Sequence, residues 1–264
     1  MFALERLRPA RPAQRWLRPG LLSDLAHLVF NGHILGAAIW VASSRWLWPL
    51  VEPVAPGWLY TLQLFAAQPV VVQIIAALFI QDFMQWWIHR LLHRVPALWR
   101  FHQIHHSVVD GEMDWIVSFR FSWVEIIVYR SLQYLPLAVM GFGTEAIMFH
   151  AVFGTLIGHL NHANVRLDYG PLRYLLNSPA MHLWHHDAHG PKHGWNFGII
   201  FSCWDWLLGT AHLPDHPPKA LGFPGVQDVP RDFLAQEGWP LASSGLARLG
   251  GGLLVASGLW VLWG

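Results

Sequence analysis

Two short stretches of the sequence repeat one histidine pattern. Residues 99–107 read WRFHQIHHS and residues 181–187 read MHLWHHD, so each contains the arrangement H-x-x-H-H. On a helix, positions i, i+3 and i+4 lie on one face, and imidazole is a good ligand for iron, copper, nickel and zinc. Each stretch therefore predicts one face of a metal site. The six histidines are His102, His105, His106, His182, His185 and His186.

Further histidines lie close to these clusters. HRLLH places His89 and His93 one helical turn apart, and GHLNHAN adds His159 and His162. A single pair at this spacing is often accidental, but the combination predicts metal binding. The three clusters and His162 supply nine imidazoles, whereas one transition-metal ion takes at most about six ligands. The sequence therefore predicts two ions.

The other residue types narrow the kind of metal centre. Cys203 is the only cysteine, which excludes an intrachain disulfide and the cysteine-rich sites typical of structural zinc. H-E-x-x-H is absent, so a zincin-type protease site is excluded. Glu-x-x-His is also absent, which excludes the carboxylate-bridged di-iron site of ferritin-like bundles.

The composition is that of a membrane protein. Hydrophobic residues make up 54% of the 264 residues and charged residues only 12%, about half the charged fraction of an ordinary soluble domain. The balance of 17 basic and 16 acidic residues argues against binding to nucleic acid, which requires a basic surface.

Apolar stretches predict the elements that must position the histidines. A transmembrane helix needs about 20 mostly apolar residues. We expect an all-α integral membrane protein of one domain, residues 1–264, with about four transmembrane helices and a cytoplasmic helical cap that holds a histidine-rich dimetal site. The predicted spans are 21–43, 58–80, 122–140 and 144–161. The remaining parts are a basic N-terminal segment (1–20), a proline-rich loop (211–245) and a possible extra membrane segment (246–263).

The positive charges predict the orientation of these spans. Five arginines precede the first span, and further basic residues follow the second and fourth spans, whereas the connections after the first and third spans hold one basic residue and none. Because lysine and arginine favour the cytoplasmic side, we expect the metal site on the cytoplasmic face of a bacterial inner membrane.

Several stretches resemble a known family. They are DFMQWWIHRLLH (82–93), LWRFHQIHHS (98–107), HANV (162–165), GPLRYLLNSPAMHLWHH (170–186) and NFGIIFSCWDWLLGT (196–210). In type and order they are similar to the fatty acid hydroxylase/sterol desaturase superfamily of integral-membrane di-iron oxygenases. The resemblance covers about residues 82–210, which would be the catalytic region. SFRFSWVE (118–125) is similar too, but lacks the proline usual before the glutamate.

The resemblance implies a set of site residues. The metal ligands would be His89, His93, His102, His105, His106, His162, His182, His185 and His186, with His159 as a further candidate. Residues that orient imidazole N–H groups would be Asp82, Glu125, Asn164 and Asp205. For Asn164 and Asp205, a capping role is an equally open interpretation.

The resemblance also implies the reaction. Two iron ions, replaceable by zinc in recombinant material, would use O2 and external electrons to hydroxylate or desaturate a C–H bond of a lipid-like substrate: a fatty acyl chain, a sterol, a carotenoid or an ether lipid. The chain has no haem-attachment motif, no ferredoxin cysteines and no nucleotide-binding glycine motif. A separate electron donor, a ferredoxin or a cytochrome, is therefore expected.

Two other functions fit parts of the pattern. A histidine-rich membrane metal transporter would place its ligands near mid-membrane on broken helices, whereas these clusters follow the predicted spans and lie beside arginines. A non-catalytic family member acting as a membrane scaffold would not need the intact histidine clusters.

Overall fold

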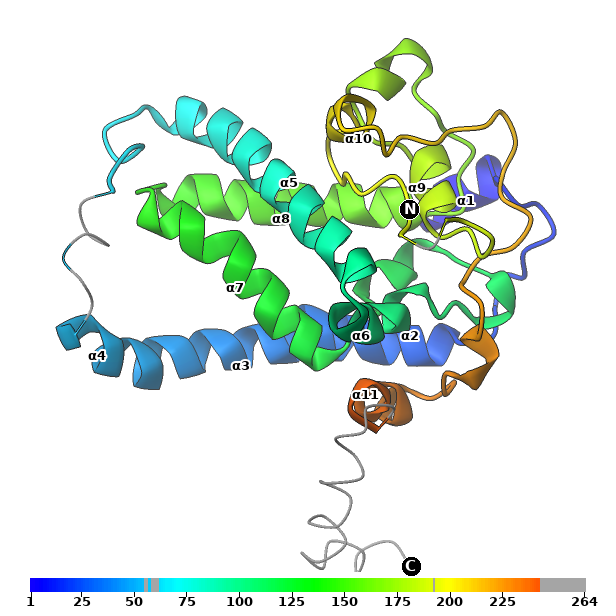
Figure 1. The fold of residues 1–264 in the computed structure, drawn as a ribbon, viewed down its shortest axis with the longest axis horizontal. Coiled ribbons are helices and arrows are strands. Elements are labelled where there is room, and N and C mark those ends of the chain that lie inside the picture. Colours follow the sequence, from blue (N-terminus) through cyan, green and yellow to red (C-terminus); the bar gives the residue numbers. More distant parts are fainter. Residues whose placement is uncertain (55–56, 58–61, 192, 243–264) are drawn as a thin grey trace, which may run out of the picture.

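The computed structural model describes residues 1–54, 57, 62–191 and 193–242, and this part of the chain is helical (Figure 1). Its only extended pairings are two isolated bridges, Leu176 with Phe201 and Asp187 with Leu221. The all-α prediction is confirmed for these residues. The predicted extra membrane segment, 246–263, lies outside them.

Four long helical segments form the body of the molecule. The first is nearly continuous from residue 21 to residue 51 and contains two short π-helical turns. Its parts are α2 (Leu21–Val29), η1 (Phe30–Ile34), α3 (Leu35–Ala42), η2 (Ser43–Leu47) and α4 (Trp48–Val51). The others are α5 (Val70–Arg94), α7 (Trp123–Val139) and α8 (Thr144–His162). Helix α5 packs against both α7 and α8.

Two helices in the described part of the chain are long and apolar enough to cross a membrane. They are Leu21–Leu47 and Val70–Arg94. At the end of the bundle far from the cap, Ala77, Leu137, Phe142 and Ala146 form a small buried cluster. Helices α7 and α8 have nearly the bounds predicted for the spans 122–140 and 144–161, but that these two helices cross a membrane stays a prediction.

The second predicted span had the wrong boundaries. The sequence predicted 58–80, but α5 begins at Val70 and continues to Arg94, and residues 62–69, the described part before it, are not helical. Pro69 precedes the first helical turn, a position where its missing N–H costs nothing. Gln81 and Asp82 do not end the helix because both are fully buried on its inner side. As a result, one continuous helix carries both the apolar stretch and His89 and His93.

Shorter elements form a cap at one end of the bundle. Its main helices are α1 (Phe2–Leu7), α6 (Pro96–His106), α9 (Pro179–His185) and α10 (Cys203–Leu207). The 3-10 turns are η5 (Val109–Gly111), η6 (Trp115–Phe119), η7 (Gly170–Tyr174) and η8 (Val226–Asp228). Both α6 and α9 begin with a proline in the first turn, and the Ser178 hydroxyl caps α9 by accepting a hydrogen bond from the Met181 amide.

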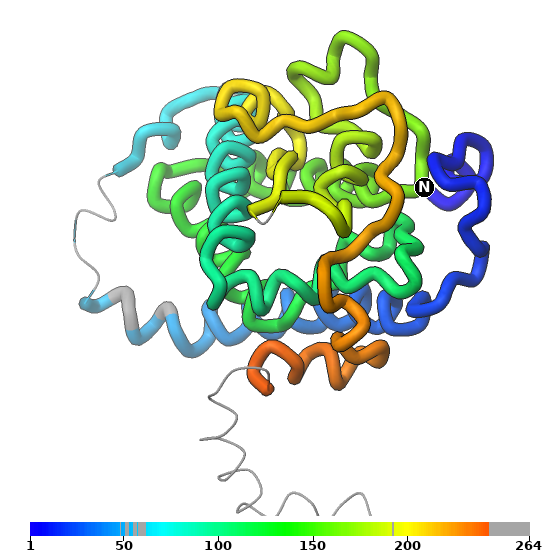
Figure 2. The backbone as a smooth tube through the Cα atoms, turned by 45° about the vertical axis from the view of Figure 1, so that its right-hand side comes forward, coloured from blue at the N-terminus to red at the C-terminus, as the bar shows by residue number. Residues whose placement is uncertain are grey.

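The proline-rich region is only partly a loop. Residues 211–232 pass over the cap, and the chain then forms α11 (Phe233–Ala242) beside α2 (Figure 2). His27 and Gln236 join these two helices, with 2.8 Å between His27 Nε2 and Gln236 Oε1. Both side chains are fully buried, so α11 is part of the fold.

The basic N-terminal segment is also built into the molecule. Arg18 is buried; its Nη1 lies 2.6 Å from Asp24 Oδ2, and its Nε lies 2.7 Å from Asp114 Oδ2. The second oxygen of Asp24 lies 2.6 Å from Nε of the fully buried Arg120. This chain of ion pairs joins the N-terminal segment to α2 and to the segment after α6. It is called the Asp24 network below.

Candidate metal centre

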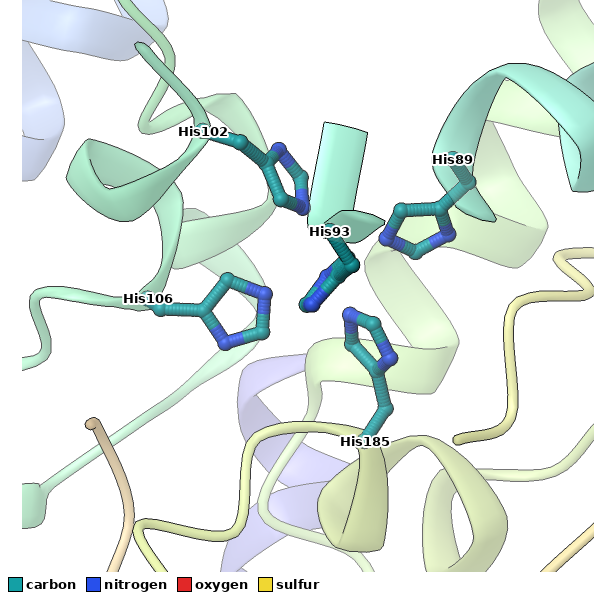
Figure 3. A group of neighbouring side chains, drawn as sticks. All are labelled: His89, His93, His102, His106 and His185. Atoms are coloured by element: carbon teal, nitrogen blue, oxygen red, sulfur yellow. The ribbon is translucent and has the colours of Figure 1, made fainter. Parts of the chain in front are cut away.

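Five histidines converge on one point in the cap. Figure 3 shows their rings directed toward a common centre. The first histidine group consists of His89 and His93 from α5, His102 and His106 from α6, and His185 from α9. Their possible ligand atoms all lie within 4.8 Å of one another. The Nε2 atom of each is buried without a hydrogen-bond partner in the described residues. Because unpaired buried polar atoms are costly, this set fits a metal ion.

A second group lies beside the first. The second histidine group consists of His105, His162, His182 and His186, from α6, α8, α9 and the residue that follows α9. The Nε2 atom of His162 lies 3.0 Å from that of His105 and 3.0 Å from that of His182. Two nitrogens that bind one ion at a right angle, each at about 2.1 Å, are separated by about 3.0 Å. The second group therefore also fits a metal ion.

Neighbouring histidines contribute to different groups. His105 belongs to the second group and His106 to the first, while His185 belongs to the first and His186 to the second. Consecutive helix residues differ by about 100° around the axis, so one short helix faces both positions. The ring centroids of His106 and His186 lie 4.3 Å apart, which makes the two groups immediate neighbours.

The outward-facing nitrogen of most ligands is fixed by a hydrogen bond. Backbone carbonyl oxygens accept from Nδ1 of four rings, and a carboxylate accepts from a fifth. The pairs are His89 with Phe197 O (2.9 Å), His105 with Arg120 O (3.2 Å), His162 with Gly158 O (2.7 Å), His185 with Trp195 O (2.8 Å) and His102 with Glu125 Oε1 (2.7 Å). With the proton on Nδ1, the Nε2 lone pair points inward, and such contacts hold a metal-binding ring in place.

Of the four residues expected to orient imidazoles, Glu125 does so directly. Asp205 acts through the backbone: its carboxylate accepts from the amides of Phe197 and Gly198 at 2.9 Å each, and from Trp86 Nε1 at 2.8 Å. The Phe197 carbonyl in turn binds His89. Asp205 therefore holds the loop that positions a ligand.

Asp82 and Asn164 do not contact an imidazole. The Asp82 carboxylate accepts from the backbone amides of Ile200 and Phe201, at 2.8 and 2.9 Å. The Asn164 side chain accepts from the Arg11 amide at 2.9 Å and donates to the Arg11 carbonyl at 3.2 Å. Each side chain bonds to the backbone of a segment that is distant in the sequence. Both residues therefore hold segments of the cap together.

His159 lies outside both groups. Its Nδ1 is 2.5 Å from the Ser118 hydroxyl, and it is absent from the two convergent sets. The sequence did not predict the four backbone carbonyls that accept from the histidines, those of Arg120, Gly158, Trp195 and Phe197. Backbone acceptors have no side-chain signature, although Arg120 and Phe197 lie within stretches that resemble the family.

One glycine is required by the close packing around the first group. Gly194 has a φ of 69°, and a Cβ atom there would lie 2.9 Å from Nδ1 of His93. Any larger residue would be strained and would push the His93 ring. The glycine at position 194 therefore allows the loop before Asn196 to pack closely against His93.

The environment keeps the histidines of both groups neutral. Burial, reinforced by the neighbouring imidazoles, lowers the pKa of six of these side chains well below the usual histidine value. The residues are His102, His105, His106, His182, His185 and His186. A neutral imidazole is the form that binds a metal ion. At neutral pH, the ligands therefore need not release a proton first.

The geometry is that of two adjacent histidine groups, each of which could hold a metal ion, at one end of apolar helices. The sequence profile described as Fatty acid hydroxylase matches residues 74–210, which include every histidine of both groups. The chain belongs to the fatty acid hydroxylase family. The resemblance seen in the sequence is thus confirmed, and family members are oxygen-dependent oxidoreductases.

Several relatives of this fatty acid hydroxylase family member have named activities. An ornithine lipid hydroxylase of Rhizobium tropici is 31% identical over 91% of this chain and 72% of its own length. A human alkylglycerol monooxygenase is 32% identical over 49% of this chain and 28% of its own. A very-long-chain aldehyde decarbonylase of rice is 28% identical over 49% of this chain and 21% of its own. No solved structure matches.

Proposed function

We propose that this protein is a membrane-bound di-iron oxygenase that hydroxylates a C–H bond of a lipid, with an ornithine lipid as the first substrate to test. The observation that carries the proposal is the pair of adjacent histidine groups, five and four rings, at one end of long apolar helices. The family and the ornithine lipid hydroxylase relative support lipid hydroxylation over desaturation.

The chain's own residues would hold and enclose the centre. The nine imidazoles would bind two iron ions, five at one and four at the other, and bound iron would supply the activation of O2 for C–H oxidation. Each of the nine side chains is at most 8% exposed. Burial of this kind excludes water from a reactive site, and the carbonyls behind the rings fix the ligand geometry.

A cavity connects the centre to the bundle. It has a volume of about 130 Å³ and lies among α5, α7, α8 and the segment around η6. Apolar side chains line the cavity together with five histidines from the two groups. These histidines are His89, His102, His105, His162 and His182. A substrate carbon in this cavity would face both ions, and the surrounding helices would let a lipid enter without crossing water.

The orientation is part of the proposal. We place the four long helices across a bacterial inner membrane, with the cap and the metal centre on the cytoplasmic side. The arginine distribution supports this placement, as does the apolar character of Leu21–Leu47 and Val70–Arg94. A separate ferredoxin or cytochrome would deliver electrons on the cap side, where the centre lies closest to the aqueous phase.

The features of the site do not favour a metal transporter. Such a protein would hold its ion on broken helices near mid-membrane, with a route to both sides. Here α5 is continuous through His89 and His93, and all nine ligands are buried in the cap. The named activities of the relatives are enzymatic.

The test combines metal analysis with lipid analysis. Protein purified from iron-replete cells should contain close to two iron atoms per chain. Cells that make ornithine lipids should gain, on expression, a lipid heavier by one oxygen atom. His106→Ala and His186→Ala should each abolish that product and lower the iron content, because each removes a ligand from a different group. The control is His33→Ala, which alters an exposed residue. Full iron and turnover in His186→Ala would contradict the paired centre.

A further inference from the structure

One wall of the cavity is more polar than an alkyl chain requires. Six side chains from α5, α7 and α8 contribute hydrogen-bonding groups to its lining: Gln85, Tyr129, Arg130, Gln133, Tyr134 and His150. Gln133 donates to Gln85 with 3.0 Å between Nε2 and Oε1. We place these helices in a membrane, where polar and charged side chains are costly and commonly mark a binding site. Packing alone therefore does not explain why so many polar side chains line this wall.

Among the described residues, His150 has no hydrogen-bond partner for either ring nitrogen. It is only 3% exposed, and neither Nδ1 nor Nε2 has a hydrogen-bond partner in the described residues. A neutral imidazole always carries one N–H donor and one acceptor, and burying both unpaired is unfavourable. One turn away, Gly154 leaves room beside the ring, since a Cβ there would lie 3.5 Å from His150 Cε1. A ligand group can satisfy this histidine.

Arg130 is a cation with no acidic partner among the described residues. It lines the same cavity and is half-buried, and within the described residues it forms no hydrogen bond and no ion pair. None of the described residues that line the cavity is acidic. Arg130 lies one helical turn before Tyr134 on α7, and the ring centroid of Tyr134 lies 6.4 Å from that of His150. Arg130 and His150 thus belong to one region of the wall.

This region is separate from the metal centre. His150 precedes the ligand His162 by twelve residues on α8, which corresponds to about 18 Å along the helix axis. A group bound at His150 would therefore not coordinate the ions. It would fix the rest of the substrate relative to them, which makes the region a candidate determinant of specificity.

We propose that Arg130 and His150 form a binding site for the acidic head group of the lipid substrate, in which Arg130 holds a carboxylate or phosphate oxyanion and His150 donates a hydrogen bond to an oxygen of the same group. The guanidinium group matches the two oxygens of such an anion. An ornithine that is acylated on its amino group retains a free carboxylate, so it has the required chemistry. The inference rests on the proposed function for its choice of a lipid.

The test measures binding without turnover. The iron-loaded full-length protein is placed in phosphatidylcholine nanodiscs and titrated calorimetrically with N-lauroyl ornithine, with its methyl ester and with lauryl phosphate. The wild-type protein should bind the acid about tenfold or more tightly than the ester, because the ester lacks the charge. Tighter binding of the phosphate would identify the phosphate as the preferred oxyanion. Equal binding of the acid and both other probes would overturn the proposal.

Variants assign the effect to the two residues. Arg130→Met should remove the preference for the acid, Arg130→Lys should keep part of it, and His150→Phe should weaken acid binding several-fold. Matched controls outside the cavity are Arg45→Met and His33→Phe, which should bind as the wild type does. An unchanged preference in Arg130→Met would exclude this site even if the wild type discriminates.

These measurements distinguish failure of the head-group site from failure of the oxygenase proposal. Iron content, measured on each variant, should stay at the wild-type level because neither residue touches a metal ligand. If no lipid is oxidised but the acid is still preferred, the oxygenase proposal fails and the binding site stands. If lipids are oxidised without any preference for an acidic head group, the binding site fails and the oxygenase proposal stands.

Discussion

For five of the nine histidines, the oxygen that accepts a hydrogen bond behind the ring decides which ring nitrogen can bind an ion. Five ligands have Nδ1 bonded to a carbonyl or carboxylate oxygen, which leaves Nε2 facing inward. The histidines themselves could be predicted from spacing and resemblance. Their acceptors could not, apart from Glu125, because most are backbone carbonyls brought in by loops. Asp82 and Asn164 show the same limit: their polar character was visible in the sequence, but their partners were not.

Glu125 should raise the affinity of the first histidine group for iron. Its carboxylate accepts from His102 Nδ1 at 2.7 Å, and both side chains are buried. Glu125→Gln keeps the size but removes the charge that makes the imidazole more basic. We expect iron affinity to fall roughly tenfold to a hundredfold, as measured by competition with a chelator. Glu112→Gln, at a partly exposed ion pair with Arg15, is the control. Equal iron retention in both variants would mean that Glu125 does not support the ligand.

Acid should destabilise the iron-free protein. Burial holds the pKa of the cap histidines below the usual value, whereas unfolding returns it to about 6.5. As the pH falls below that value, the unfolded chain takes up protons that the folded chain does not, so the free energy of unfolding decreases. Denaturant unfolding in detergent should show this between about pH 7 and pH 5. His186→Ala, with one buried imidazole fewer, should show a smaller decrease. A flat profile would contradict the argument.

At the level of elements, long-range partners explain the differences from the sequence predictions. The sequence predicted α7 and α8 closely because each is a self-contained apolar stretch. It misplaced the second span because Gln81 and Asp82 read as the end of an apolar run, although both face the interior. The N-terminal arginines indicated the topology, but the sequence did not show that one of them, Arg18, is also a buried partner of Asp24 and Asp114. Pairs separated by about a hundred residues leave no local pattern.

The Asp24 network should be important for stability. Asp24 lies between Arg18 and Arg120, with 2.6 Å to each, and all three side chains are buried. Asp24→Asn would leave two buried guanidinium groups without this anion, and a loss of about 3–5 kcal/mol is expected. Because the Arg120 carbonyl binds His105, iron retention should fall as well. Denaturant unfolding and iron analysis measure both effects. Asp110→Asn, which breaks exposed pairs, should cost about 1 kcal/mol or less. Equal stability of the two variants would contradict the role.

For the whole molecule, the histidine clusters meet at one end of the bundle, as the sequence predicted from their place after apolar stretches. The four spans stay a prediction. Among the described residues, two helices are long and apolar enough to cross a membrane, Leu21–Leu47 and Val70–Arg94, and α7 has only 17 residues. The sequence also gave no sign of how α11 closes against α2.

The two ends of the bundle should label from opposite sides of the membrane. Leu172, in the cap, and Leu64, in the turn region before α5, are both exposed. In a Cys203→Ser background, a membrane-impermeant thiol reagent should reach Leu172→Cys only from the cytoplasmic side and Leu64→Cys only from the opposite side. The same measurement on inverted vesicles should reverse the pattern. Labelling of both positions from one side would rule out the four-span arrangement.

In the proposed centre, the division of the ligands between the two groups would set an order of assembly. Four of the five ligands of the first group lie within residues 89–106, whereas three of the four in the second group lie within residues 162–186. During synthesis, four of the five histidines of the first group are therefore made early. At that point only one histidine of the second group, His105, has been made. Neither group is complete without a residue from the other half of the chain, His185 or His105. Each bound ion would thus act as a cross-link between early and late segments, so full metallation must wait until the late segment has been synthesised and has docked.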